Sequence, residues 1–142
     1  MGRKRAREDA FKCIYELEFD DSKNVDKILK NSYLENSNEE EEKEYMEIVL
    51  NGVKENLAAI DEIILAKLKN WSMKRIAKID LAILRLAVYE IEYLNDIPVK
   101  VTANEAVELA KKYGNNDSKS FINGVIAKII ESKEEKSEKQ GI

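Results

Sequence analysis

Residues 73–95 read MKRIAKIDLAILRLAVYEIEYLN, a stretch that is apolar around almost the whole of a helical wheel. Its apolar positions are Ile76, Ile79, Leu81, Ile83, Leu84, Leu86, Ala87, Val88 and Ile91. Only Lys78, Arg85 and Glu92 form a narrow polar strip. A helix that is apolar on nearly every side belongs in the middle of a bundle, so this stretch predicts a central buried helix.

The chain around this stretch has the composition of an all-helical protein. Its 142 residues include only five Gly and one Pro, too few turn signals for a β-sandwich or barrel of this length. It carries 24 basic and 28 acidic residues, a formal charge of −4. We find no run of about 18 apolar residues and no signal peptide, which predicts a cytoplasmic protein without a membrane span.

Helical periodicity extends in both directions from the central helix. A first helix is expected over residues 3–19 and a second over 25–34 behind Asn24 as N-cap. Residues 39–69 form one helix or two, with a break near Gly52 or Ala58. After Pro98, the sequence TANE at 102–105 matches a capping box, which predicts a helix start there. A last helix follows the turn at 114–118, and residues 133–142 are expected to be a disordered tail.

The charges are segregated along the chain. Residues 1–12 carry five basic residues against two acidic ones, whereas residues 35–47 carry seven glutamates and one lysine. On the first helix Lys4, Arg7, Phe11 and Tyr15 share one face. That face suits phosphate contacts beside base stacking, or it only widens the core stripe while the cations are solvated. Because salt screens electrostatic interactions beyond about 10 Å, an acidic protein with a basic N-terminal segment can still bind a polyanion there.

Residues for catalysis or metal binding are scarce. The chain has no His, and its single Cys13 lies on the apolar stripe of the first helix, where it is expected to be a buried hydrophobe. Zinc sites and nucleophilic arrangements of the Ser/His or Cys/His type therefore cannot form. The glycines are isolated and form no phosphate-binding loop. We expect no enzymatic activity, no metal and no cofactor.

Four segments carry a family resemblance. In order they are RKRAREDAFKCIY at 3–15, RIAKIDLAILRLAVYEIEYLNDIP at 75–98, VTANEAVELAKKYG at 101–114 and DSKSFINGVIAKI at 117–129. Together they resemble the NusB family of bacterial transcription antitermination factors. The resemblance implies an all-α fold of about seven helices in two small packed bundles. It makes residues 1–132 one RNA-binding domain, with subdomains at about 1–70 and 71–132.

The resemblance also implies a function and partners. Members of the family bind boxA-type RNA in nascent ribosomal RNA transcripts, together with the ribosomal protein NusE. They help the transcription elongation complex read through terminators. The free protein is expected to be a monomer or a homodimer. The alternative, from another functional class, is a helical protein–protein scaffold whose basic arm is incidental.

The site residues implied by the resemblance fall into three groups. The arginine-rich motif falls on Arg3, Lys4, Arg5 and Arg7, and the second RNA-contacting group consists of Tyr113, Asp117, Ser118, Lys119, Ser120 and Phe121. The NusE-facing group consists of Ile76, Asp80 and Leu84. Three roles stay open. Asp117 either caps the last helix or recognises a base, Asp80 either caps the central helix or faces NusE, and Arg85 is either structural or adjacent to RNA.

Overall fold

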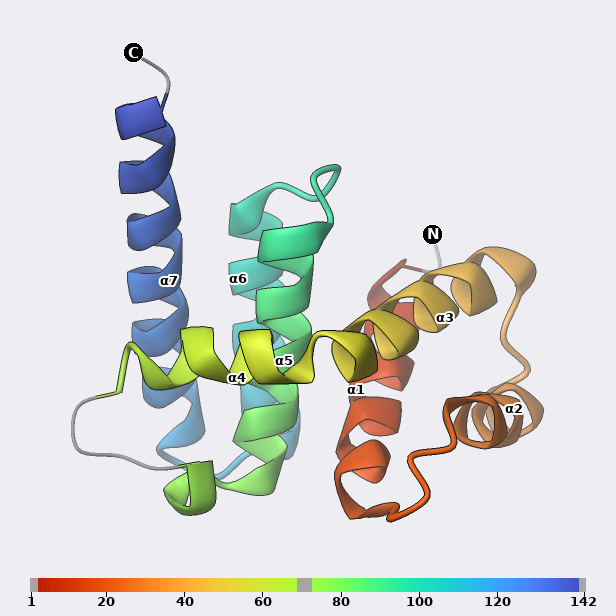
Figure 1. The fold of residues 1–142 in the computed structure, drawn as a ribbon. Helices are drawn as coiled ribbons and strands as arrows, with labels where there is room; N and C mark the ends of the chain where they lie inside the picture. The colour runs from red at the N-terminus through yellow and green to blue at the C-terminus, as the bar shows by residue number, and fades with distance from the viewer. Residues whose placement is uncertain (1–2, 69–72, 141–142) are drawn as a thin grey trace.

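The computed structural model describes residues 3–68 and 73–140, which form seven α-helices and one short 3-10 turn (Figure 1). The elements are α1 (Arg3–Phe19), α2 (Val25–Asn36), α3 (Glu40–Glu55), α4 (Leu57–Leu65), η1 (Met73–Arg75), α5 (Lys78–Tyr93), α6 (Val99–Tyr113) and α7 (Ser118–Gln140). The predicted all-helical fold of about seven helices is confirmed.

Helix α5 is the centre of the molecule. It packs against α1, α3, α4, α6 and α7, and every residue from Leu81 to Ile91 is buried. Figure 1 shows α1, α2 and α3 on one side, with α5, α6 and α7 side by side on the other. In the sequence, helix α4 lies between the two groups. In space it packs on α5 and α7. The apolar pattern on nearly all sides of the central helix therefore agrees with its buried position in the middle of the molecule.

Local capping sets the ends of the N-terminal helices. The Asn24 side chain accepts a hydrogen bond from the backbone N–H of Lys27, as predicted. The backbone N–H of Glu39 donates to the Glu42 carboxylate at 3.0 Å, which anchors the acidic first turn of α3. The break between α3 and α4 falls at Asn56, whose side-chain amide donates to the carbonyl of Gly52 at 2.8 Å.

Gly52 has a packing role that the sequence did not indicate. A Cβ atom at this position would lie 2.2 Å from the ring of Tyr89, which no real contact allows. The glycine therefore lets α3 approach α5 at Tyr89. The α3–α5 contact, together with that between α1 and α5, joins the two halves of the molecule.

The predicted start of α6 is wrong by four residues, since the capping box makes Thr102 the N-cap and the structure has Pro98 there. The helix begins at Val99, directly after Pro98, because proline fits the start of a helix, where no N–H is needed. Thr102 and Glu105 thus lie inside the helix and form no capping box. The Thr102 hydroxyl instead donates to the buried Glu90 carboxylate at 2.7 Å. The Thr102 side chain thus bonds to Glu90 on α5 and not, as the capping-box pattern predicts, to a nearby backbone N–H.

The C-terminal segment also differs from expectation. Helix α7 continues to Gln140, whereas the sequence predicts a disordered tail from residue 133. Lys133 reaches back to α5 and donates from Nζ to the carbonyl of Ile91 at 2.8 Å. The residues that follow are mostly Lys and Glu, both good helix formers, so the helix persists beyond the last core residue.

Candidate nucleic-acid interface

Helices α1 and α6 border an open groove of about 520 Å³. It is lined by the first turns of α1 and the later turns of α6: Lys4, Arg5, Arg7, Glu8, Glu105, Glu108, Leu109, Lys111 and Lys112. Five of these side chains are basic and three acidic, so the groove is locally positive although the chain is acidic. Cations at the end of α6 are favoured because they meet the negative end of the helix dipole.

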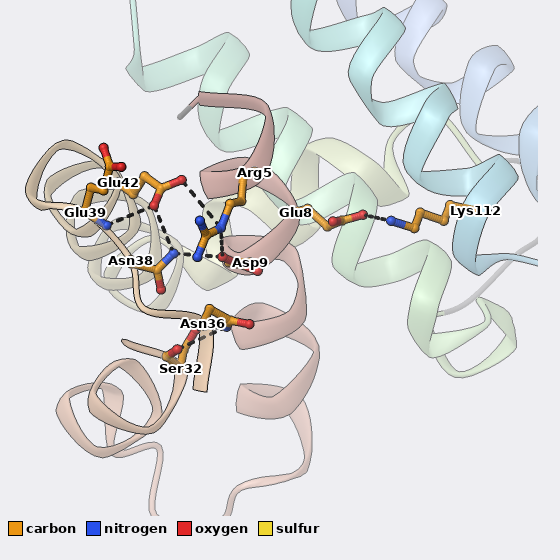
Figure 2. A network of polar contacts seen from close by, with 9 residues as sticks. All are labelled: Arg5, Glu8, Asp9, Ser32, Asn36, Asn38, Glu39, Glu42 and Lys112. Atoms are coloured by element: carbon orange, nitrogen blue, oxygen red, sulfur yellow. Dashed lines mark hydrogen bonds and ion pairs between the residues drawn. The ribbon is translucent and has the colours of Figure 1, made fainter. Parts of the chain in front are cut away.

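Ion pairs of exposed lysines bridge the groove. Lys112 Nζ lies 2.7 Å from Glu8 Oε2, and this pair is visible in Figure 2. The hydrogen bond to Glu8 raises the pKa of Lys112. Lys4 Nζ lies 3.5 Å from Glu105 Oε1. Both lysines are largely exposed, and exposed ion pairs contribute little, so an incoming phosphate can compete for these cations.

The two exposed arginines of α1, Arg3 and Arg5, have their partners on another side of the helix, although Arg5 also borders the groove. Figure 2 shows Arg5 turned toward Asp9 and Glu42, while Glu8 points away from them toward Lys112. Arg5 Nε lies 3.9 Å from Asp9 Oδ2 and 3.8 Å from Glu42 Oε2, so both contacts are loose. The Arg3 guanidinium stands 4.6 Å from the ring centre of Tyr45. The cations Arg3, Lys4 and Arg5 therefore fan out around the first turn of α1.

Arg7 does not fit its predicted role as a phosphate contact. Its residue is only 4% exposed, and its Nε donates to the Glu90 carboxylate at 2.8 Å. Burial alone would lower the pKa of Arg7, but the Glu90 carboxylate outweighs this and raises it. Because a buried cation without a partner is costly, Arg7 stays with Glu90 and holds α1 against α5.

The aromatic residues of the predicted α1 face belong to the core. Phe11 is buried, and its ring centre lies 5.2 Å from that of Tyr113 at the end of α6. Tyr113 is half-buried, with Lys12 Nζ at 5.6 Å and Lys112 Nζ at 5.4 Å from its ring centre. For Phe11 the core interpretation is thus the right one. Tyr113 remains the aromatic residue at the cationic edge of the groove.

The turn between α6 and α7 is organised by Asn115. Its side-chain oxygen accepts hydrogen bonds from the backbone N–H groups of Asp117 and Ser118 at 2.8 and 3.1 Å. Asp117 directly precedes α7, and its backbone carbonyl accepts the N–H of Phe121 at 3.1 Å. Among the described hydrogen bonds none involves its carboxylate, so the predicted side-chain cap is not formed. Asp117 and Lys119 are exposed, whereas Phe121 is half-buried and packs against the core.

Two of the three predicted partner-binding residues are in the core. Ile76 is 3% exposed and Leu84 is fully buried, so neither faces a partner in this structure. The family resemblance implied that both face NusE, although both lie in the apolar stretch 73–95, whose pattern predicts burial. Asp80 does not cap α5, because Ala77 is the N-cap residue. Asp80 is itself 6% exposed, and burial raises the pKa of its carboxyl group.

Sequence reasoning missed three residues of this region. Lys111 and Lys112 were read only as part of a helix, yet they supply two of the cations in the groove. The available signal was their position in the last helical turn, just before Gly114. Asn115 could have been found as an Asx-turn residue in the stretch GNNDS.

The described residues give no second kind of site. Across residues 3–68 and 73–140 we find no group of three or more potential metal ligands among His, Cys, Asp and Glu. Within the same ranges, every helix is too short or too polar to cross a bilayer. Cys13 is buried as predicted, and burial raises the pKa of its thiol to about 11.

The fold and the groove define the class: a small all-helical protein of two packed bundles, with a cation-lined groove between helices of the two halves. The model of the NusB family matches residues 4–131, so the chain belongs to the NusB family.

Individual relatives match over nearly their whole length. A Clostridium acetobutylicum protein named transcription antitermination protein NusB is 47% identical over 137 residues, which is 96% of this chain and 100% of the relative. The solved structure of T. maritima NusB matches with a TM-score of 0.85 at 37% identity, over 91% of this chain and 90% of that one. A crystal structure of the antitermination factors NusB and NusE in complex with dsRNA matches with a TM-score of 0.83 at 27% identity, over 93% and 99%.

Proposed function

We propose that this protein is a transcription antitermination factor that acts in the cytoplasm. It binds boxA-type single-stranded RNA in nascent ribosomal RNA transcripts together with NusE. As part of the elongation complex it then helps RNA polymerase read through terminators. The observation that carries the proposal is the positive groove between α1 and α6, in a family with a member crystallised with NusE and RNA.

The exposed cations of the first turn of α1 are suited to a phosphate backbone. Arg3, Lys4 and Arg5 are exposed and held only by loose or weak contacts, so RNA can displace their present partners. The arginine fork matches phosphate geometry particularly well. In our proposal Arg7 does not contact RNA. It holds the first turns of α1 in place through its hydrogen bond to Glu90.

The end of α6 and the following turn are suited to bases. Tyr113 and Phe121 are the aromatic residues here, and unpaired bases of single-stranded RNA commonly stack on such rings. Asp117 and Lys119 are exposed on the same turn and can make polar contacts. We place the NusE contact near the start of α5, around Asp80, with surface residues other than Ile76 and Leu84.

Fluorescent boxA-like RNA and a scrambled control, titrated with and without NusE at two salt concentrations, test the proposal. We expect selective binding that NusE strengthens and that salt weakens. Release of counterions from three to four phosphates gives a log–log slope of roughly −2 to −3. The variant Lys111→Gln/Lys112→Gln should reduce that slope by roughly one to one and a half. The matched control is Lys30→Gln, since Lys30 is exposed on α2, outside the groove lining.

Two results would contradict the proposal. Equal binding to boxA-like and scrambled RNA, with NusE still bound, would favour the protein–protein scaffold. An unchanged salt slope in the double lysine variant would remove the groove from the RNA path. In either case the folded state of each variant is checked by its melting temperature, so that lost binding is not confused with unfolding.

A further inference from the structure

Asp9 on α1 and Glu42 in the first turn of α3 are two buried carboxylates that face the side chain of Arg5 (Figure 2). Only 4% of Asp9 and 3% of Glu42 is exposed. Carboxylates are seldom buried to this extent unless they are paired. Among the ion pairs of the described residues, Arg5 is the cation of both: its Nε lies 3.9 Å from Asp9 Oδ2 and 3.8 Å from Glu42 Oε2. One loosely held arginine thus balances two buried acids.

Neutral donors hold the two carboxylates in place independently of Arg5. The side-chain amide of Asn38 donates to Asp9 Oδ2 at 2.8 Å and to Glu42 Oε1 at 3.4 Å. The backbone N–H of Glu39 donates to the same Oε1 atom at 3.0 Å. This bond, with smaller contributions from Asn38 and Arg5, lowers the pKa of Glu42 although burial opposes it, so the group is ionised at neutral pH. Both carboxylates therefore remain hydrogen-bonded when Arg5 moves away.

Arg5 can reach both the acidic pair and the groove. Its side chain is 49% exposed, and the residue also borders the groove between α1 and α6. Its contacts with Asp9 and Glu42 are longer than hydrogen bonds. A phosphate can offer the same guanidinium shorter, charge-assisted hydrogen bonds. The two carboxylates and an RNA phosphate are therefore alternative anionic partners of Arg5.

We propose that Asp9 and Glu42 restrain RNA binding by competing with RNA phosphate for Arg5. The inference rests on the proposed function and adds a regulating contact to its site. In the free protein Arg5 lies toward the two acids, and RNA has to draw it away from two buried charges. Removal of either acid should therefore strengthen RNA binding, a direction of change that a damaged or partly unfolded protein does not produce.

The test measures the affinity of Glu42→Gln for boxA-like RNA in the full chain without NusE. Glutamine keeps a side-chain oxygen for the backbone N–H of Glu39, so the start of α3 is preserved, but it lacks the charge that attracts Arg5. We expect the affinity to rise about three- to fivefold, the upper range for a partly exposed ion pair. Asp9→Asn should produce a gain of similar size.

Glu41→Gln is the matched control, because it removes the same charge from the neighbouring position. Glu41 is exposed, and the ion pairs of α3 among the described residues involve Glu40, Glu42 and Lys43 instead. Its effect should stay below about twofold, since salt screens a charge without a direct cation partner. In an Arg5→Gln background the gain from Glu42→Gln should fall to that of the control, because the two changes act on one contact.

The inference is overturned if Glu42→Gln binds RNA no more tightly than Glu41→Gln, or if its gain persists in the Arg5→Gln background. If the melting temperature shows that Glu42→Gln does not fold, Asp9→Asn decides by the same comparison. Scrambled RNA separates this outcome from failure of the proposed function. Because Arg5 is expected to contact phosphate, the gain should be equal on both RNAs. A wild type without preference for boxA-like RNA contradicts the proposed function, while the gain on either RNA still decides the inference.

Discussion

Two of the buried charged residues of helix α5, Arg85 and Glu90, are neutralised in opposite ways. Arg85 is a cation between two carboxylates: its Nη1 lies 2.6 Å from Glu18 Oε1, and its Nε and Nη2 each lie 2.9 Å from an oxygen of Asp61. Glu90 is a carboxylate that accepts hydrogen bonds from Arg7, Tyr45 and Thr102. One cluster joins α1 and α4 to α5, and the other joins α1, α3 and α6 to α5.

The two clusters differ in their access to water. Glu90 is fully buried and its cation Arg7 is nearly so, whereas the side chains of Glu18 and Asp61 remain 25% and 21% exposed. Burial, followed by the charge of Glu90, raises the pKa of the Tyr45 hydroxyl, which keeps it protonated as a donor. A charge left alone in the Glu90 cluster cannot be rehydrated without opening the core. The Glu90 cluster should therefore be the more sensitive of the two.

Glu90→Gln should have the largest effect of any single change in this comparison. It leaves Arg7 buried without a compensating charge, and breaking a buried pair in this way costs about 3–5 kcal/mol. The free energy of unfolding measured in urea gives the loss directly, provided that the m-value is unchanged.

The control for Glu90→Gln is the double variant Arg7→Met/Glu90→Leu, which removes both charges. It should recover most of the lost stability, because well-packed apolar residues often replace a buried ion pair without penalty. A Glu90→Gln variant within about 1 kcal/mol of the wild type would show that Arg7 is less dependent on Glu90 than its burial implies.

Arg85→Met should have a smaller effect, about 1–3 kcal/mol by the same urea measurement. The carboxylates of Glu18 and Asp61 lose their cation but can turn toward water, since both are partly exposed. Arg85→Lys is the matched control, because it keeps the charge and loses the two-bond fork to Asp61. If Arg85→Met lowered the free energy of unfolding more than Glu90→Gln does, the exposure of the partner side chains would not explain the different sensitivity of the two clusters.

The same two clusters show what the sequence could and could not predict. The burial of α5 was predictable because the all-round apolar pattern lies within one segment. The burial of Arg7 was not, because its partner Glu90 stands 83 positions away in the chain. Arg85 proves to be structural, a choice that the sequence left open because its partners Glu18 and Asp61 stand 67 and 24 positions away in the chain.

In the candidate site too, features set by neighbouring residues were predictable, whereas contacts between distant residues were not. Local charge patterns identified Arg3, Lys4 and Arg5, which the structure leaves exposed. The capping-box pattern at Thr102 failed because the hydroxyl had a better, non-local acceptor in Glu90. Local rules thus placed the surface cations, whereas the burial of Arg7 and the failed capping box at Thr102 both depend on Glu90, which lies on another helix.

The smallest expected effect is a pH dependence that belongs to the Arg85 cluster. Burial alone would raise the pKa of Glu18, but hydrogen bonds from Arg85 and Lys78 outweigh it and lower the pKa below its usual value. A group with a lowered folded-state pKa stabilises the protein above its unfolded pKa, about 4.3 for Glu, and this contribution is lost as pH falls through the folded pKa.

In Arg85→Met the main cause of the lowered Glu18 pKa is gone. The stability difference between wild type and Arg85→Met should therefore shrink as pH falls from 6 toward 3, measured by urea unfolding at each pH. Lys78→Met should produce a weaker version of the same convergence, since Lys78 Nζ lies farther from Glu18, at 3.2 Å. Parallel curves for wild type and Arg85→Met would mean that Glu18 stays as acidic without Arg85, and that the cluster is held by Asp61 alone.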